Sequence, residues 1–163
     1  MHLQLFLIWN NAIKHYNYII KTLSLTFKIK KVYETYWDQT KTANQIIKLY
    51  QCTSKQAQTK LLECGYGKIF IILVEDITPL ADEYLHLAPL SKLYPTKYGI
   101  IEVSKHAQEI KSEIRMHLNG NKSIHGTMTD FEFINDINVC LNYTEQDIQN
   151  LYKTDWNKKI CKI

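Results

Sequence analysis

The chain has 163 residues, enough for one domain with a substantial hydrophobic core, and we expect a single domain over residues 1–163. With 45% hydrophobic residues, 22% charged residues and few glycines or prolines, the composition is typical of a globular domain and excludes a long flexible linker. The net charge of +4 comes from lysines scattered along the chain and a single arginine, Arg115. A nucleic-acid binder more often concentrates arginine in a basic stripe, so we expect no nucleic-acid partner.

Cysteine spacing and the first apolar run indicate the redox state of the thiols and the cellular compartment of the protein. The four cysteines form no CxxC pair and no His-Cys cluster with zinc spacing, so we expect free thiols and no metal site. The apolar run Leu3–Trp9 is too short to span a bilayer and lacks the basic flank of a signal peptide. We therefore expect a cytoplasmic protein without a membrane partner.

The first half of the chain alternates predicted strands and helices. The run at Leu3–Trp9 predicts a buried strand, and the unbroken apolar run at 68–75 predicts a central strand covered on both faces. Between them, apolar residues recur at helical spacing after Asn11, which we expect to cap the helix. In chain order we predict a strand at 3–9, a helix at 11–26, a strand at 27–37, helices from Thr40 and over 54–63, and a strand at 68–75.

The second half is less regular. Residues 76–98 contain all three prolines and no clean period, and we expect a helical turn near 80–87. Further on we predict a short strand at 100–103, a helix from Ser104 to Leu118, a short strand near His125, a helix starting at Thr129, and a last helix at 144–152 before a lysine-rich tail. For the helix after Thr129, the inner face is expected to comprise Phe131, Ile134, Ile137 and Leu141. This element order favours the α+β class, with helices packed on one face of a mainly antiparallel sheet.

His125 is the strongest candidate for chemistry. Gly126 and the hydroxyl residue Thr127 follow it, and a carboxylate, Glu132, comes seven positions later. Glycine lets backbone or ligand approach the imidazole closely. A carboxylate can hold the proton on one ring nitrogen and leave the other free to act as a nucleophile. The alternative is a histidine that merely precedes a helix capped by Thr129 and Glu132.

His125-Gly126-Thr127 followed by Glu132 resembles the active-site signature of nucleoside diphosphate kinases, N-x-x-H-G-S-D followed by a helix that bears a glutamate. Three further stretches are similar to parts of that family in the same order. They are Leu49-Tyr50, similar to a His-Tyr that ends a helix; Gly67–Glu75, similar to a Gly-Pro-apolar strand; and Arg115–Gly120, similar to Arg-x-x-Leu-Gly at the end of a helix. The predicted first strand also begins at the N-terminus, as it does in that family, and together the matches span roughly residues 3–141.

The resemblance implies a ferredoxin-like sandwich of the βαββαβ type and phosphoryl transfer through a phosphohistidine. His125 would take the terminal phosphoryl group of a nucleoside triphosphate, which is accompanied by Mg²⁺, and pass it to a nucleoside diphosphate or a related phosphorylated acceptor. The other implied roles are orientation of the ring for Glu132, a hydrogen bond beside His125 for Tyr50, and phosphate or nucleotide binding for Arg115, Lys122, Gly126 and Thr127. The family usually forms oligomers, which leaves a homo-oligomer open.

Elementary chemistry supports part of this reading. A transferred phosphoryl group needs cations and hydrogen-bond donors more than it needs acid-base catalysis, and the planar fork of Arg115 suits phosphate. Arg115 has no acidic residue three or four positions away on its helix, so no local ion pair explains it. The alternatives are a solvated surface arginine for Arg115, a capping role for Glu132 and a core aromatic for Tyr50.

The sequence also departs from the family. The phosphate-binding lysine at the end of the first strand falls near Trp9, and Lys122 stands where the family has asparagine. The long nucleotide-binding loop is reduced to about 119–123, so acceptor and base preference stay open. A rival interpretation is therefore a non-catalytic nucleotide-binding or assembly module that keeps the fold. A third, an RNA-binding ferredoxin-like domain, is disfavoured because Gly67–Phe70 is too apolar.

Overall fold

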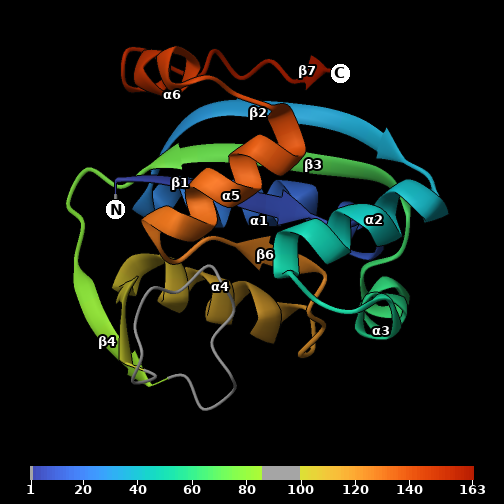
Figure 1. The fold of residues 1–163 in the computed structure, drawn as a ribbon. Coiled ribbons are helices and arrows are strands. Elements are labelled where there is room, and N and C mark those ends of the chain that lie inside the picture. Colours follow the sequence, from blue (N-terminus) through green and yellow to red (C-terminus); the bar gives the residue numbers. More distant parts are fainter. Residues whose placement is uncertain (1, 86–99) are drawn as a thin grey trace.

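The computed structural model describes residues 2–85 and 100–163. A five-stranded sheet runs through the centre in the order β6 (Ile124–Gly126), β1 (Leu3–Ile8), β3 (Gly67–Glu75), β2 (Lys28–Trp37) and β7 (Cys161–Lys162) (Figure 1). All neighbouring strands are antiparallel except β2 and β7. The mainly antiparallel sheet and the central position of β3 confirm the predicted α+β class.

Two crossover helices give the sheet its ferredoxin-like topology. Helix α1 (Tyr16–Thr26) joins β1 to β2, and α4 (Lys105–His117) lies between β3 and β6 in the chain. Both helices pack on one face of the sheet, where their apolar residues meet those of the strands. This first core cluster includes Phe6, Ile8, Ile19, Leu23, Ile72, Ala107, Ile110 and Ile114. The element order β1-α1-β2-β3-α4-β6 with strand order β6-β1-β3-β2 is the expected βαββαβ arrangement.

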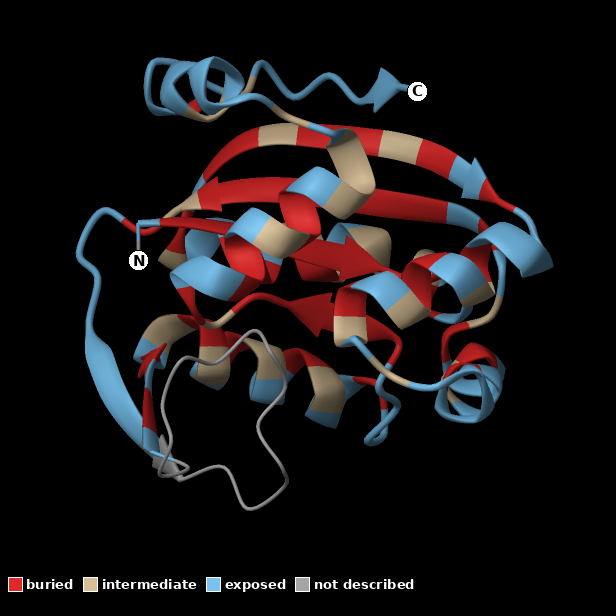
Figure 2. Cartoon of the chain, viewed as in Figure 1, coloured by how far each residue is buried: buried red, intermediate tan, exposed pale blue. Residues whose placement is uncertain are grey.

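The opposite face of the sheet is also covered, so the expectation of helices on one face holds only for the two crossover helices. The covering elements are α2 (Gln39–Tyr50), α3 (Ser54–Cys64), α5 (Asp130–Leu141) and α6 (Glu145–Tyr152). They enclose a second core cluster that includes Leu5, Leu7, Trp9, Ile46, Leu61, Ile71 and Ile137. The physical reason is the composition of β1 and β3, whose residues are mostly apolar and mostly buried (red in Figure 2).

Three local predictions were wrong. The helix expected at 11–26 begins instead with a 3₁₀ turn, η1 (Asn10–His15), and Asn11 does not cap it. The Asn11 side-chain amide donates to the carbonyls of Leu62 and Glu63 (3.3 and 2.9 Å) at the end of α3. Where a helical turn was expected, β4 (Ala81–Leu85) pairs with β5 (Ile100–Ser104) in a separate two-stranded sheet. Residues 86–87 of that expected turn lie outside the described residues.

Other local predictions were confirmed. Ser104 caps α4 by accepting a hydrogen bond from the backbone N–H of Ala107 (3.2 Å). The inward residues of α4 are buried as expected.

The lysine-rich tail adds a strand that sequence patterning did not indicate, because β7 has only two residues and no apolar alternation.

Helix α5 turns a different face to the core from the one expected. Phe131 and Ile134 are 55% and 47% exposed, whereas Ile137 is buried as predicted. The buried face carries Glu132, Phe133, Asp136 and Ile137. The apolar residues of α5 therefore do not mark its buried face, which carries the carboxylates of Glu132 and Asp136.

Gly126 has a packing role in β6. A Cβ at this position would lie 2.5 Å from Cε1 of the buried Phe6 ring on β1. We expect Gly126→Ala to lower the free energy of unfolding by about 1–3 kcal/mol, because the added methyl group overpacks the core. Urea unfolding of the variant and of Gly126→Ala combined with Phe6→Leu measures this effect. Equal losses with and without the smaller residue 6 would contradict the packing role.

Candidate functional site

His125 is the middle residue of β6, at the edge of the five-stranded sheet. It lies opposite Leu7 on β1. The strand is anchored on both sides of His125 by the backbone bonds from Trp9 N to Ser123 O and from Thr127 N to Leu5 O, both 3.0 Å. The predicted short strand thus holds the imidazole at a defined depth, with 8% of the residue exposed.

A buried carboxylate from α5 orients the imidazole. Nε2 of His125 donates to Oδ2 of Asp136 over 2.6 Å, and Asp136 is 1% exposed. The side-chain amide of Asn135 donates to the other carboxylate oxygen of Asp136 (2.9 Å). Because the proton of a neutral ring is then on Nε2, Nδ1 carries the free lone pair. This is the arrangement that a nucleophilic histidine requires.

The carboxylate on His125 is therefore Asp136 and not the predicted Glu132. Asp136 comes 11 residues after the histidine, one helical turn beyond Glu132 and on the same face of α5. Glu132 accepts a hydrogen bond from the backbone N–H of Met128 (2.6 Å), and its own N–H donates to the Thr129 hydroxyl (3.1 Å). Thr129 therefore caps α5 as expected, whereas the Glu132 side chain bonds to Met128, the residue before the N-cap, and not to the N-cap backbone as in a capping box. The sequence signal that could have identified Asp136 is its spacing of four residues from Glu132, which places both carboxylates on one face of the helix.

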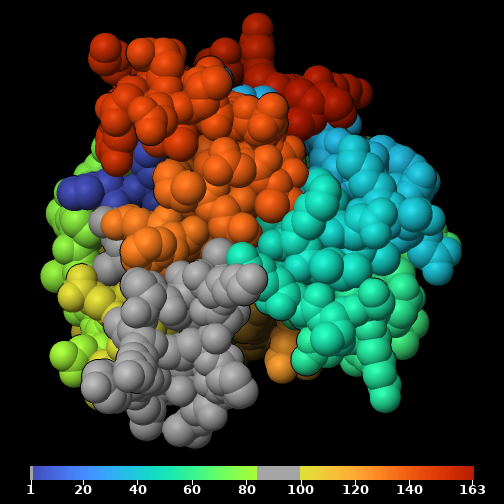
Figure 3. Space-filling view, viewed as in Figure 1, coloured from blue at the N-terminus to red at the C-terminus, as the bar shows by residue number. Residues whose placement is uncertain are grey.

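Tyr50 lies beside His125, as expected. The two rings meet edge to face with their centroids 5.0 Å apart. Burial raises the pKa of the Tyr50 hydroxyl well above its ordinary value, so the group stays protonated and can donate. The Nε1–H of the buried Trp9 lies near this hydroxyl and opposes part of the shift. Helices α2 and α5, which carry Tyr50 and Asp136, meet at the surface in Figure 3.

Two cations from α4 flank the strand that carries His125. Lys111 Nζ donates to the carbonyl of Gly126 (3.1 Å), and Arg115 Nη2 donates to the carbonyl of Ile124 (3.2 Å). The backbone N–H of Thr127 points to β1, where it donates to Leu5. Backbone groups of successive strand residues point to alternate sides, so the carbonyls of residues 124 and 126 point away from β1, to the open edge of the sheet. Lys111 and Arg115 are four residues apart, so they share one face of the helix. In the described part of the chain the buried Nε of Arg115 has no partner.

A third cation comes from α3. Lys60 Nζ lies 5.0 Å from the centroid of the Tyr50 ring. Sequence reasoning identified Arg115 but missed Lys60 and Lys111, because Lys60 belongs to a separate helix and Lys111 is one of many lysines. Burial lowers the pKa of Lys111 to about 8; the nearby carboxylates Glu132 and Asp136 oppose this shift, and the positive charges of Arg115 and Lys60 add to it.

The structure places the other predicted site residues elsewhere. The hydroxyl of Thr127 is buried and accepts a hydrogen bond from the backbone N–H of Leu5 (3.0 Å), so it joins strands rather than facing a ligand. The close approach that Gly126 permits is to Phe6 and not to the imidazole. Lys122 is exposed. The cations that help to lower the pKa of Lys111 are Arg115 and Lys60, and Lys122 is not among them.

The lowered pKa of Lys111 predicts a pH dependence of stability. The ordinary pKa is 10.5, so between about pH 8 and 10.5 the unfolded chain binds more protons at this residue than the folded chain does. This residue's contribution to the free energy of unfolding should therefore rise with pH over that range. We expect Lys111→Met to reduce that rise in urea unfolding, while Lys105→Met, exposed on the same helix, leaves it unchanged. Identical slopes for the Lys111 variant and the wild type would contradict this assignment.

Among the residues described, no group of three histidine, cysteine or acidic side chains is placed to hold a metal ion. The helices seen in the same ranges include none that is long and apolar enough to cross a membrane.

No protein-family model matches the sequence, and no curated protein matches it. Among solved structures, the fold is similar to the nucleoside diphosphate kinase of Aquifex aeolicus in an orthorhombic crystal form, with 13% identity and a TM-score of 0.50. The superposition covers 90% of this chain and 97% of that one. The likeness shows that this chain has a nucleoside diphosphate kinase-like fold.

Proposed function

We propose that the protein is a phosphotransferase that carries a terminal phosphoryl group on Nδ1 of His125, from a nucleoside triphosphate to a nucleoside diphosphate or a related phosphorylated acceptor. The observation that supports this most is the 2.6 Å hydrogen bond from His125 Nε2 to the buried Asp136. It leaves Nδ1 as the nucleophilic nitrogen on a strand flanked by cations. The similarity of fold agrees with the proposal and is the reason for naming nucleotides as substrates.

The proposed transfer takes place in two steps. The lone pair of Nδ1 attacks the terminal phosphorus, the bond from that phosphorus to the bridging oxygen breaks, and the diphosphate leaves with the electron pair. The ring becomes positively charged, and the carboxylate of Asp136 stabilises it through the Nε2–H hydrogen bond. In the second step a phosphate oxygen of the acceptor attacks the same phosphorus, and the N–P bond breaks. Nδ1 thus regains its lone pair.

The cations provide the electrostatic part of the proposal. Lys111 and Arg115 hold the carbonyls on either side of His125, and Lys60 lies over Tyr50 beside the imidazole. Positive charge at this position would stabilise the negative oxygens of the transferred group. These residues offer a substitute for the first-strand lysine, whose place is taken by the buried Trp9. We propose Mg²⁺ as part of the substrate, bound to the nucleotide phosphates, as is usual for this ion.

A second histidine–aspartate pair provides an internal comparison. Nδ1 of His106 lies 2.8 Å from Oδ2 of the buried Asp76, and His106 lines a cavity together with Glu109 and Glu113. The two pairs have similar chemistry but opposite surroundings. Carboxylates around His106 repel a phosphate, whereas lysine and arginine side chains attract one to His125. Electrostatics therefore favours His125 as the phosphorylated residue.

Phosphorylation of His125 can be tested with γ-labelled ATP and Mg²⁺. We expect wild-type protein to acquire an acid-labile label, His125→Ala to acquire none, and His106→Ala to be labelled like the wild type. The label should leave the protein when nucleoside diphosphate is added. Absence of an acid-labile label on folded wild-type protein would contradict the mechanism. Nucleotide binding without a label would favour the non-catalytic binding module instead.

The role of Asp136 can be separated from that of Glu132. Asp136→Asn keeps an acceptor for Nε2–H but removes the charge that stabilises the phosphorylated ring. We expect the rate of labelling to fall about 100-fold, a loss typical of removing one electrostatic stabiliser, with nucleotide affinity nearly unchanged. Glu132→Gln, a matched change on the same helix, should alter stability more than rate. A larger loss of rate in the Glu132 variant would reverse the two assignments.

A further inference from the structure

A groove lies against α1, the helix that packs on the face of the sheet opposite α2 and α5. Its cavity volume is about 580 Å³, within the usual range for small-molecule sites. It is bounded by α1, by the first residues of β2 and by the C-terminal segment 155–158. We infer that this groove binds a small aromatic anion, independently of any chemistry at His125.

The walls of the groove are apolar and partly aromatic. Phe27 and Ile29 belong to the core on this face, and the partly buried Ile20 and Trp156 pack against the same cluster. Flat aromatic rings stack well on indole and phenyl faces. The groove therefore suits a ligand with a planar apolar ring.

The indole of Trp156 is held in place by its own turn. Its Nε1–H donates to the carbonyl of Lys159 (2.8 Å), and the backbone N–H of Lys159 donates to the side-chain oxygen of Asn157 (3.0 Å). Lys28 and Asp155 form an ion pair over 2.6 Å that ties the segment to β2. Because the indole N–H is already satisfied, only the ring itself is available for a ligand, and it is presented without loss of conformational entropy.

Lysines give the groove a positive charge. Of the four charged residues that line it, Lys28 and Asp155 neutralise each other. Lys21 and Lys158 line the groove as well, and neither forms an ion pair within the described part of the chain. Two uncompensated ammonium groups above an apolar floor favour a carboxylate, sulfonate or phosphate attached to the ring.

The test uses 1-naphthoate as the aromatic anion, with 1-naphthalenemethanol as the neutral comparison and inorganic phosphate as the anion without a ring. Binding is followed by NMR through the indole N–H signal of Trp156, which a Trp156→Phe variant distinguishes from those of Trp9 and Trp37. We expect a saturable shift with 1-naphthoate, weaker binding of the alcohol, and no shift with phosphate alone.

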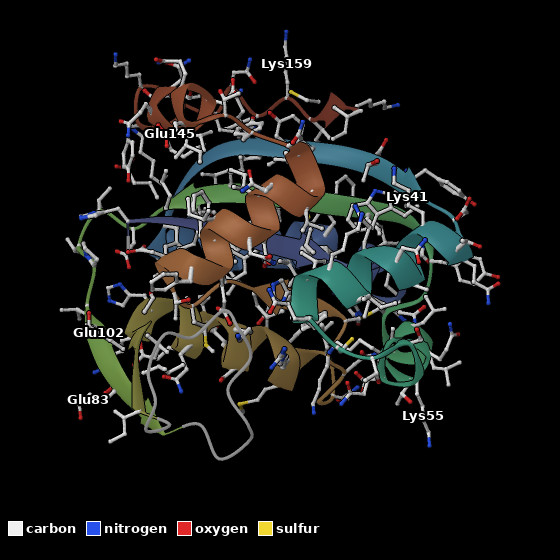
Figure 4. The ribbon with its side chains drawn as sticks, viewed as in Figure 1. Lys41, Lys55, Glu83, Glu102, Glu145 and Lys159 are labelled. Atoms are coloured by element: carbon white, nitrogen blue, oxygen red, sulfur yellow. The ribbon has the colours of Figure 1, made fainter. Side chains whose placement is uncertain are left out.

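Charge-reversal variants locate the anion. Lys21→Glu and Lys158→Glu should each weaken 1-naphthoate binding about tenfold, equivalent to about 1.4 kcal/mol. Lys159→Glu is the matched control, because Lys159 is adjacent in sequence but its side chain points away from the molecule (Figure 4). It should leave affinity unchanged. The proposal would be overturned by equal affinity for the alcohol, by equal effects of the Lys158 and Lys159 variants, or by the absence of a saturable shift. The result of the labelling experiment at His125 does not bear on it.

Discussion

The architecture depends on burying both faces of β1 and β3. Each strand is an almost continuous apolar run, so a cover on one face alone would leave large side chains in water. Crossover helices cover one face and the additional helices cover the other. As a result, the short edge strand β6 lies between two helical layers. One layer supplies the carboxylate that orients His125, and the other supplies the cations that flank its strand.

Buried charged groups in this site are partly compensated by their neighbours. A buried carboxylate without partners costs several kcal/mol, but Asp136 accepts hydrogen bonds from both His125 and Asn135. Lys111 is desolvated near two other cations, and the carboxylates of Glu132 and Asp136 offset part of that cost. The inward carboxylates of α5 and the lysine and arginine of α4 therefore belong to one electrostatic unit. Burial shifts the pKa values of Lys111 and Tyr50 in this unit, and such shifts are more common at functional sites than in structural cores.

Local patterning predicted the elements whose burial is uniform along their length. The runs of β1 and β3 and the spacing of Ala107, Ile110 and Ile114 in α4 were sufficient, because each has one dominant environment. Patterning failed for α5, where the apolar Phe131 and Ile134 are exposed and Asp136 is buried. The proximity of Tyr50 to His125 was implied by the family resemblance and not by local patterning. The lysines at 60 and 111 could not be predicted, because their proximity to His125 arises from the packing of separate helices rather than from spacing along the chain.

The two-residue strand β7 affects how the sheet behaves toward other chains. Strand β2 would otherwise form an open edge with unpaired backbone groups, a surface on which a strand from another molecule can add. The tail occupies this edge opposite Tyr33 and Glu34, and the backbone N–H of Ile163 donates to the Glu34 carbonyl (3.1 Å). Glu34 also lies between Lys68 and Lys162, at 3.1 and 3.8 Å. A short parallel strand and a row of alternating charge together make this margin a poor template for intermolecular β-sheet growth.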